Sequence, residues 1–569
     1  MKHSLGKRML AALLCIPMAF ALAGCAKPAA SSSGTGSSQT DSASSAAEQP
    51  TYYNKEGYPI CDTKIEVTCS GPNDSAYDWN ATMFKEQMRD RMGIDITFSK
   101  YSSEEWQTQL SLMVNSDRLT DLICHASIDR SQMEIWGDEG YFLNLNKYAD
   151  LMPNMQKLFN EEPALRATFT TSSGAIYGLN QINRAAFSNV ALVFINNVWL
   201  KNVGMKTPTN TDELYEVLKA FRDQDANGNG DASDELPMVL STDTAGSVER
   251  ELMEAFGVYS SSSDCSLQVM DGGKVELRNT SENYKEFLKY MHKLYAEGLM
   301  DAESYIQSKD QLVDKGGKDL VGMYGGDEPA WIRSTTQAED VNWDALLGLA
   351  SPVDSTHTIV KTNGITGNIR MAISAKTEYP EALCRLFDYF YTDEGRVETR
   401  YGYEGKSFEW VSDDIVGAKA PMFITDPNDP GLKFRYIVDY GFDVNFVTNK
   451  FDACAQIDYD KLTDDQFNKL TTDAYGWVAP VYKAYNRKDN VVVDAYPNVS
   501  YTKEEATERS TLFSDVANTI KSYKVAFITG ESNLDTDWNT FVSEVERSGA
   551  KRLVEIEQAA YDRYAKNLK

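Results

Sequence analysis

The sequence is poor in the residues that most often carry catalytic or metal chemistry. Only four histidines occur among 569 residues, and the eight cysteines are scattered. No Cys-x-x-Cys or mixed Cys/His spacing indicates a zinc site. Gly-x-Ser-x-Gly, His-Glu-x-x-His, P-loop and dinucleotide-binding glycine patterns are all missing. An enzyme is therefore not expected, although a glycosidase-like carboxylate pair drawn from Asp327, Glu328 and Glu404 stays open, because such a pair is defined by its spacing in space.

The sequence also lacks a basic stripe and, after its first residues, an apolar run long enough to span a membrane. The chain has 84 Asp and Glu against 56 Lys and Arg, a formal net charge of −28. An acidic protein without a basic stripe binds nucleic acid poorly, so no nucleic-acid partner is expected. After residue 24 no run approaches the roughly 18 apolar residues that mark a membrane-spanning helix. The bulk composition indicates an acidic globular protein.

The first residues form a pattern typical of export. A positively charged start over residues 2–8 precedes an apolar run over 9–22, which is too short for a permanent membrane span. The run ends in Leu-Ala-Gly-Cys, which resembles the bacterial lipobox, in which the cysteine is lipidated and begins the mature chain. We therefore expect residues 1–24 to be a lipoprotein signal peptide and Cys25 to be lipidated. The alternative is an ordinary signal peptide with a chance cysteine.

The composition changes again after the lipobox. Residues 25–50 are rich in Ser, Ala and Gly, which is typical of a flexible tether. Residues 51–569 are long enough for two lobes with separate cores. A diacylglycerol and an acyl chain on Cys25 would give stable anchoring. We expect the body at the extracellular face of the cell membrane, tethered by this lipid.

Hydrophobic periodicity predicts a mixed α/β body. Strands are predicted at 64–69, 94–98 and 122–124, with helices at 78–92 and 104–115 between them. This alternation is typical of βαβ units and a parallel sheet. Further along the chain, the apolar spacing predicts a strand at 191–195 and helices at 211–221, 283–297, 379–391 and 538–564. Cys61 and Cys69 flank the first predicted strand and could pair, although buried free thiols are the default expectation.

The most specific local motif is an acidic loop at residues 223–235. It matches an EF-hand-type calcium loop, in which clustered oxygens surround the ion and Gly228 permits the sharp turn. The candidate ligands are Asp223, Asp225, Asn227, Asn229 through its carbonyl, Asp231 through a water, and Asp234 or Glu235. The twelfth position holds Asp234 where an EF-hand has Glu, and Glu235 follows it. We expect a structural Ca²⁺, and the alternative is a solvated acidic turn.

Several further blocks of the sequence are distinctive. They occur in order along residues 52–569, and they are YNKEGYPI at 53–60, FINNVWL at 194–200, VGMKTPT at 203–209, LYAEGLMD at 294–301, YGYEGKSFEW at 401–410 and QAAYDRY at 558–564. Together these blocks resemble one known family, the family 1 extracellular solute-binding lipoproteins of bacterial ABC importers. The resemblance implies a two-lobed, periplasmic-binding-protein-like α/β fold with discontinuous lobes, a hinge and a ligand cleft between the lobes. It implies a binding protein that delivers its ligand to ABC permease subunits. Alginate-binding members carry a similar calcium site, which supports the metal expectation.

An oligosaccharide is the expected ligand, bound by a monomeric protein. Sugar sites combine aromatic rings with fixed polar groups, and the ligand cleft of an α/β fold lies beyond the carboxyl ends of its strands. The candidates in such loops are Asn73, Trp79, His125, Tyr324, Asp327, Trp331, Glu404 and Trp477. Trp79 suits a core position equally well, and His125 suits an ordinary loop position. The alternative ligands are a peptide or another polar solute. The alternative role is presentation of the ligand to a sensor kinase.

Overall fold

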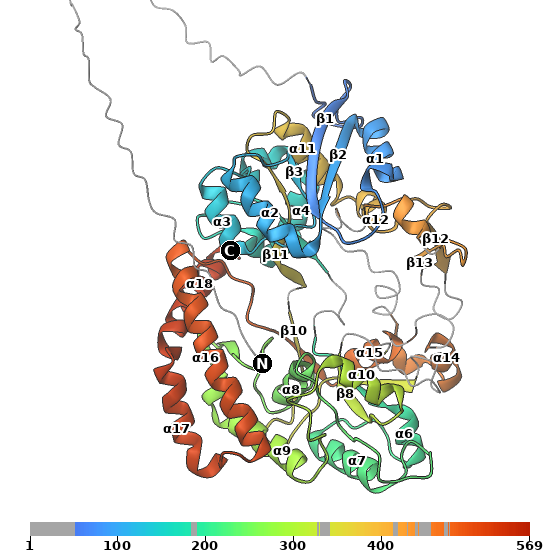
Figure 1. Ribbon diagram of the computed structural model, residues 1–569, viewed down its shortest axis with the longest axis vertical. Coiled ribbons are helices and arrows are strands. Elements are labelled where there is room, and N and C mark those ends of the chain that lie inside the picture. The colour runs from blue at the N-terminus through green and yellow to red at the C-terminus, as the bar shows by residue number, and fades with distance from the viewer. Residues whose placement is uncertain are drawn as a thin grey trace, which may run out of the picture. The chain divides into compact units, whose positions relative to one another are not determined.

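Two main sheets organise the computed structural model, and each is surrounded by its own hydrophobic core (Figure 1). The structure describes residues 52–568, except for 184–189, 327–328, 330–341, 363, 413–418, 430, 439–441, 443–456, 472–475 and 477. These residues belong to one unit, Thr51–Lys569. The predicted signal peptide, Cys25 and the tether lie outside the described residues.

The first lobe is built on a five-stranded sheet with the strand order β2-β1-β3-β11-β4. Strands β1 (Ile65–Pro72), β2 (Ile94–Tyr101) and β3 (Leu122–Ile123) are parallel, whereas β11 (Ile365–Ile373) runs antiparallel to β3 and to β4 (Leu179–Ile182). The βαβ order predicted from the periodicity is therefore confirmed. The helix predicted at 78–92 consists of three pieces, η1 (Trp79–Ala81), α1 (Met83–Gln87) and the π-helical η2 (Met88–Met92).

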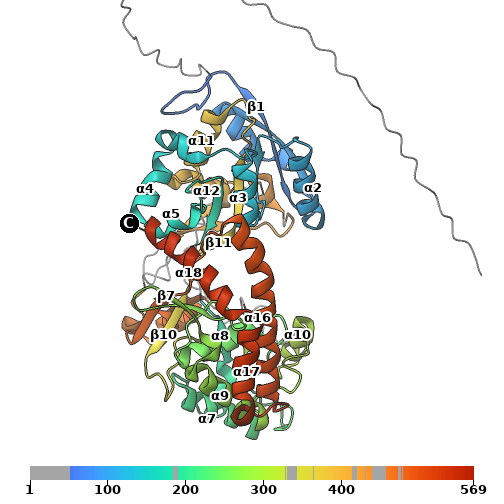
Figure 2. The same cartoon turned by 90° about the vertical axis from the view of Figure 1, so that its left-hand side faces the viewer.

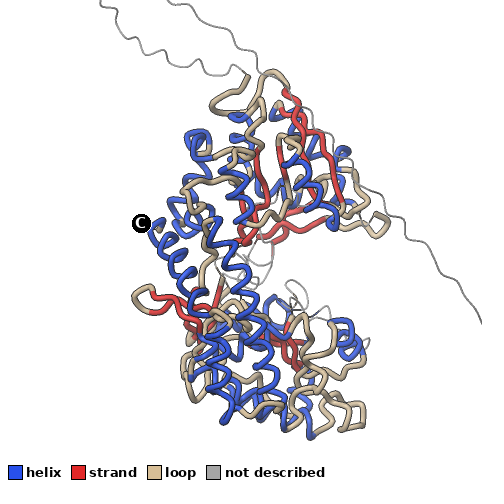
Figure 3. Tube along the Cα trace, turned by 60° about the vertical axis from the view of Figure 1, so that its left-hand side comes forward, coloured by secondary structure: helices blue, strands red, loops and turns tan. Residues whose placement is uncertain are grey.

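Helices cover both faces of this sheet (Figures 1 and 3). The helix predicted at 104–115 is α2 (Ser103–Asn115), and its N-cap Ser102 accepts a hydrogen bond from the backbone N–H of Glu105. The other helical segments of this lobe are α3 (Arg130–Asp138), η3 (Leu145–Leu151), α4 (Pro153–Glu161), α5 (Pro163–Phe169), α11 (Pro380–Tyr389), α12 (Asp393–Tyr401) and η8 (Leu432–Arg435). The hairpin β12 (Phe408–Ser412) and β13 (Lys419–Phe423) follows α12.

The second lobe is built on the antiparallel sheet β8-β5-β9, formed by β5 (Val193–Asn196), β8 (Met323–Gly325) and β9 (Trp343–Leu346). Two ribbons accompany it, β6 (Leu267–Met270) with β7 (Lys274–Leu277), and β10 (His357–Lys361) with β14 (Asn490–Asp494). Its helical segments are α6 (Asn197–Asn202), α7 (Thr211–Asp223), α8 (Ala245–Ala255), η5 (Arg278–Thr280), α9 (Glu282–Ala296), α10 (Lys309–Gly317), η9 (Tyr459–Lys461), α14 (Asp464–Lys469) and α15 (Val478–Tyr485).

Each lobe is assembled from separate stretches of the chain. Strand β4 belongs to the first lobe and the next strand, β5, to the second, and β10 of the second lobe leads directly into β11 of the first. The discontinuous lobes expected from the resemblance are therefore confirmed.

Among the residues that the structure describes, no helix is long and apolar enough to cross a membrane.

Three long helices complete the chain and lie alongside one another (Figure 2). They are α16 (Lys503–Thr529), α17 (Leu534–Arg547) and α18 (Ala550–Asn567). Helix α16 packs against α9 of the second lobe, and α18 packs against α5 of the first. The single helix predicted at 538–564 is wrong, because the chain turns at Gly549. This glycine has φ +101°, and a Cβ atom on it would lie only 2.5 Å from Leu512 Cδ2.

No disulfide bond is present among the described residues. Cys61, Cys69, Cys124, Cys265 and Cys384 are buried free thiols. The pairing considered for Cys61 and Cys69 is therefore wrong, and both side chains pack in the core of the first lobe. They act as small apolar residues.

Candidate functional site

A cavity of about 430 Å³ lies at the carboxyl ends of the parallel strands of the first lobe. This is the edge at which α/β sheets bind ligands. The loop after β1, the start of α2, the loop after β3 and strand β11 all contribute to its wall. The lining residues are Pro72, Asn73, Asp74, Ser75, Ser103, Trp106, Gln107, His125, Ser127 and Arg370.

The polar groups of this cavity are held by local hydrogen bonds. The Asn73 Oδ1 atom accepts from the backbone N–H of Ser75 at 2.6 Å, and Asp74 Oδ1 accepts from the backbone N–H of Ser103 at 2.8 Å. Hydrogen bonds from the side chain and the backbone N–H of Ser103 lower the pKa of Asp74, so this carboxylate is charged at neutral pH. The loop after β1 thus presents an amide and a carboxylate in fixed orientations.

The loop after β3 has an unusual backbone. His125 has φ +52° and Ser127 has φ +48°, a left-handed conformation that few residues other than glycine adopt. The loop is held from both sides, because the carbonyl of Ala126 accepts from Trp106 Nε1 at 2.6 Å and its N–H donates to the carbonyl of Arg370 at 2.9 Å. Backbone strain of this kind gathers at binding sites.

The structure brings Asn73 and His125 together, and it places Trp79, Tyr324 and Glu404 away from them. Trp79 is buried in the core against Phe98, at 5.8 Å between ring centroids. Tyr324 is fully buried on β8, with its ring 5.0 Å from that of Trp343. Glu404 is exposed in the turn before β12 and does not line the cavity. Asp327, Trp331 and Trp477 lie outside the described residues.

Trp79 and Tyr324 therefore belong to the hydrophobic cores of the two lobes. Sequence reasoning missed Asp74, Trp106, Gln107 and Arg370. Asp74 directly follows the predicted Asn73 in a strand-end loop, so the same signal could have found it. Arg370 comes from β11, far along the chain, and no local pattern indicates that this strand inserts beside β3.

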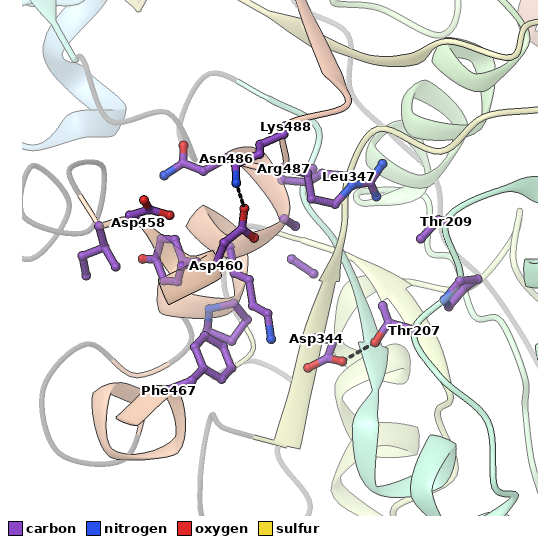
Figure 4. A pocket seen from close by; sticks show the side chains of 17 residues that line it. Thr207, Thr209, Asp344, Leu347, Asp458, Asp460, Phe467, Asn486, Arg487 and Lys488 are labelled. Carbon is purple, nitrogen blue, oxygen red and sulfur yellow. Dashed lines mark hydrogen bonds and ion pairs between the residues drawn. The ribbon is translucent and has the colours of Figure 1, made fainter. Parts of the chain in front are cut away.

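A second cavity, of about 520 Å³, lies within the second lobe between β9, the loop before α7, and the segments η9, α14 and α15 (Figure 4). Asp344 accepts hydrogen bonds from the hydroxyl of Thr207 and from Asn197 Nδ2. On the opposite wall, the Lys483 ammonium lies 4.0 Å from the centroid of the Phe467 ring. This cavity offers an aromatic ring, a cation and a carboxylate, and no motif in the sequence indicated it.

A third cavity, of about 560 Å³, is lined by residues of both lobes and by α16. The Arg130 guanidinium donates to the carbonyl of Asn498 at 3.1 Å and to Ser500 Oγ at 2.8 Å. Burial lowers the pKa of Arg130 to about 10, so it stays charged at neutral pH. Nearby, Arg509 is paired with the buried Glu557 at 2.6 Å. The charged groups in this wall already bind other parts of the chain, which indicates a structural role.

The acidic loop at 223–235 has two carboxylate oxygens without a partner. Asp225 Oδ1 and Glu235 Oε2 are buried and have no hydrogen-bond donor among the described residues. Glu235 is 7% exposed, and burial raises its pKa. The second oxygen of Asp225 accepts from the N–H of Gly230 at 3.0 Å, and that of Glu235 accepts from the N–H of Ala226 at 2.8 Å. A cation would satisfy the two oxygens that lack a donor.

The remaining predicted metal ligands bind within the chain. Asp234 accepts from the side-chain amides of Asn227 at 3.1 Å and Asn229 at 2.8 Å. Asp231 accepts from the N–H of Ser233, and Asp223 is paired with Arg222. No group of three or more acidic, His or Cys side chains within the described residues is arranged to hold a metal ion. The donor set is suitable for calcium, but coordination requires several of these side chains to turn inward.

The chain belongs to the family of bacterial extracellular solute-binding proteins, whose family model matches residues 72–397. This assignment confirms the family expected from the sequence, and it is a family of binding proteins rather than enzymes. The chain is 26% identical over 529 residues to the fructooligosaccharide ABC transporter substrate-binding protein FusA of Streptococcus pneumoniae, covering 90% of this chain and 94% of that relative. It is also 26% identical over 254 residues to the polygalacturonan/rhamnogalacturonan-binding protein YtcQ of Bacillus subtilis, covering 43% of this chain and 46% of YtcQ.

Solved structures have the same fold. FusA of S. pneumoniae in complex with kestose matches with a TM-score of 0.63 and 24% identity, covering 88% of this chain and all of that one. A solute-binding protein of Bifidobacterium longum infantis, described as binding HMO, matches with a TM-score of 0.69 and 21% identity over 88% of this chain and 99% of that one. The expected two-lobed solute-binding fold is thus confirmed.

Proposed function

We propose that this protein captures an oligosaccharide outside the cell and delivers it, as a monomer, to the permease subunits of an ABC importer. The family supports solute capture, and the relatives named for fructooligosaccharide and for galacturonan support a carbohydrate. The observation that carries the proposal is the cavity at the carboxyl ends of β1, β2 and β3, where Asn73, Asp74, His125 and Arg370 gather. A peptide or another polar solute is the alternative cargo, and a sensor kinase the alternative receiver.

The chemistry of this cavity suits sugar hydroxyls. Asp74 is a charged acceptor, Arg370 supplies donors, and Asn73 has both, so each can bind a hydroxyl without proton transfer. We propose that the ligand lies against this wall and that the second lobe closes over it, as hinge closure does in periplasmic binding proteins. Asp327, Trp331 and Trp477 remain proposed ligand contacts, and Glu404 is a proposed contact from the first lobe.

We further propose that Cys25 anchors the protein to the membrane through lipid, after removal of residues 1–24, with residues 25–50 as the tether. The support is the lipobox-like sequence and the composition that follows it. The proposed calcium site uses Asp225 and Glu235 first, because these two have buried oxygens without a donor. A structure of FusA described as an EF-hand mutant supports a loop of this kind in a relative.

A thermal-shift screen of the protein without residues 1–25 tests the proposed cargo. The panel contains fructo-, galacturono- and amino-sugar oligosaccharides and short peptides, in calcium-containing buffer. A ligand that binds only the folded state at about 100 times its Kd stabilises by about 2.7 kcal/mol, so one glycan class should raise the melting temperature. A rise with peptides alone would overturn the carbohydrate proposal.

A further inference from the structure

Two buried carboxyl groups lie beside the strand that leads from the second lobe into the first. Glu251 and Glu254 of α8 are each 1% exposed. They lie three residues apart on the helix, and this spacing places both side chains on the same side of it. One oxygen of Glu251 accepts from the backbone N–H of Leu349 at 3.0 Å, and one oxygen of Glu254 accepts from that of Val360 at 2.9 Å. The second oxygen of each is buried and has no hydrogen-bond partner among the described residues.

Two guanidinium groups lie near the pair without forming an ion pair with it. Arg250, on the same helix, donates from Nε to the carbonyl of Ser260 at 3.2 Å, and its Nη2 atom is buried with no hydrogen-bond partner among the described residues. Arg487, from the turn after α15, is paired with Asp489 at 3.1 Å and also donates to the carbonyl of Gly348. In the described part of the chain, neither Glu251 nor Glu254 forms an ion pair.

The other titratable groups near α8 also have partners of their own. The phenol of Tyr259 donates to Asp354 at 2.6 Å, on the β10 side of the helix. The Nε2 atom of His357, at the start of β10, lies 3.4 Å from Oδ2 of Asp489. The third buried glutamate of α8, Glu249, is paired with the buried Lys524 of α16.

Two buried negative charges three residues apart on one helix are unfavourable, because each loses hydration and repels the other. Burial raises the pKa of Glu254 to about 8. Burial, together with the negative charge of Glu254, raises the pKa of Glu251 well above its usual value. Paired carboxyl groups elsewhere solve the same problem by holding one proton between them.

We propose that Glu251 and Glu254 share a proton through the two oxygens that lack a partner, and that this pair is a pH-sensitive anchor for β10. Val360 lies within β10, and the chain runs from β10 directly into β11 of the first lobe. A shared proton leaves one net charge on the pair, which the nearby guanidinium charges of Arg250 and Arg487 offset. Loss of that proton adds a second buried charge and destabilises the folded state in which α8 packs against β10.

The direction of the pH effect follows from linkage. The folded protein keeps the proton to higher pH than the unfolded chain, in which glutamate has its ordinary pKa of about 4.3. Between about pH 4.5 and pH 8 the folded state therefore binds more protons, and the free energy of unfolding falls as the pH rises. No ligand takes part, so the outcome is independent of the proposed cargo.

The test compares the melting temperature of the ligand-free protein at several values between pH 5.5 and pH 8.5 with that of E254Q and E251Q/E254Q. Glutamine has nearly the shape of a protonated glutamate and cannot ionise. The exposed Glu216, on α7, provides the control variant E216Q. We expect the wild type and E216Q to lose about 3 °C or more relative to E251Q/E254Q as the pH rises through this range. Parallel pH profiles of wild type and E251Q/E254Q would overturn the proposal.

Infrared spectroscopy gives a second measurement on the folded wild type, in case the double variant does not fold. A protonated carboxyl has a C=O stretch separate from that of carboxylates. We expect this band at pH 7 in the wild type and in E216Q, with its loss as the pH is raised past 8. A spectrum without a protonated-carboxyl band at pH 7 would also overturn the proposal.

Discussion

Asn73 and His125 line the same cavity, one directly after β1 and the other two residues after β3. These two strands are parallel neighbours in the sheet, so their carboxyl ends open at one edge. The parallel pairing of β1 with β3 places the Asn73 amide and the His125 imidazole on one wall, although these residues are far apart in the sequence.

The first prediction distinguishes the strand-end cavity from the cavity in the second lobe. We expect H125N and R370Q to weaken oligosaccharide binding by about tenfold or more, because a hydrogen bond to a charged group contributes about 1.5–3 kcal/mol. Asparagine is chosen at position 125 because it tolerates the left-handed backbone there. Isothermal titration calorimetry measures the change.

Matched controls for this prediction come from the other cavity. F467A and K483M alter the wall formed by α14 and α15 and should leave the affinity unchanged. If these two variants abolish binding while H125N and R370Q bind normally, the ligand belongs in the second-lobe cavity.

Calcium should stabilise the protein through the acidic loop. Extracellular loops of this kind bind with a Kd of about 10⁻⁴–10⁻³ M, so the melting temperature is compared in millimolar calcium and in EGTA. We expect a rise with calcium in the wild type and in the control D271N, which changes an exposed turn, and no rise in D225N or E235Q. An equal response to calcium and EGTA in the wild type would contradict the site.

The same measurement separates the two residues that could complete the loop. Glu235 has a buried oxygen with no donor among the described residues, whereas both oxygens of Asp234 accept from asparagine side chains. We therefore expect D234N to keep at least part of the calcium response that E235Q loses. The reverse result would assign the final ligand to Asp234.

Gly549 is expected to be essential to the turn between α17 and α18. G549A combines a left-handed backbone with a steric overlap on Leu512, and we expect it to lower the free energy of unfolding by about 1–3 kcal/mol. G272A is the control, because its φ is also positive but its Cβ meets nothing within 4 Å. Urea unfolding should show a smaller loss for G272A, and equal losses would mean that the backbone alone accounts for the effect.

Lipidation is tested on the full chain. C25S removes the thiol that would carry the lipid and should therefore release the protein from the membrane fraction into the medium. C15S, within the predicted signal peptide, is the control and should stay anchored. Mass spectrometry of the N-terminal peptide should find diacylglycerol on Cys25, and an unmodified Cys25 in membrane-bound protein would contradict the anchor.

The order of elements in the first lobe could be predicted from the sequence because period-2 and helical spacing are local properties. The break at Gly549 was missed because the apolar spacing of Trp538, Phe541 and Val545 resumes at Leu553, as if one helix continued. The rule that aromatic residues at strand ends contact ligand failed to separate core from cleft, since Trp79 and Tyr324 are both buried. Arg370 could not be found because antiparallel pairing of β11 with β3 depends on distant contacts.

Calorimetric titration of the protein without residues 1–25, with a fructooligosaccharide mixture, a galacturonan oligosaccharide and a peptide of similar size, tests the central claim most directly. The account predicts saturable heat at one site per protein for one saccharide class and none for the peptide. Saturable binding of the peptide, with no heat from either saccharide, would contradict it.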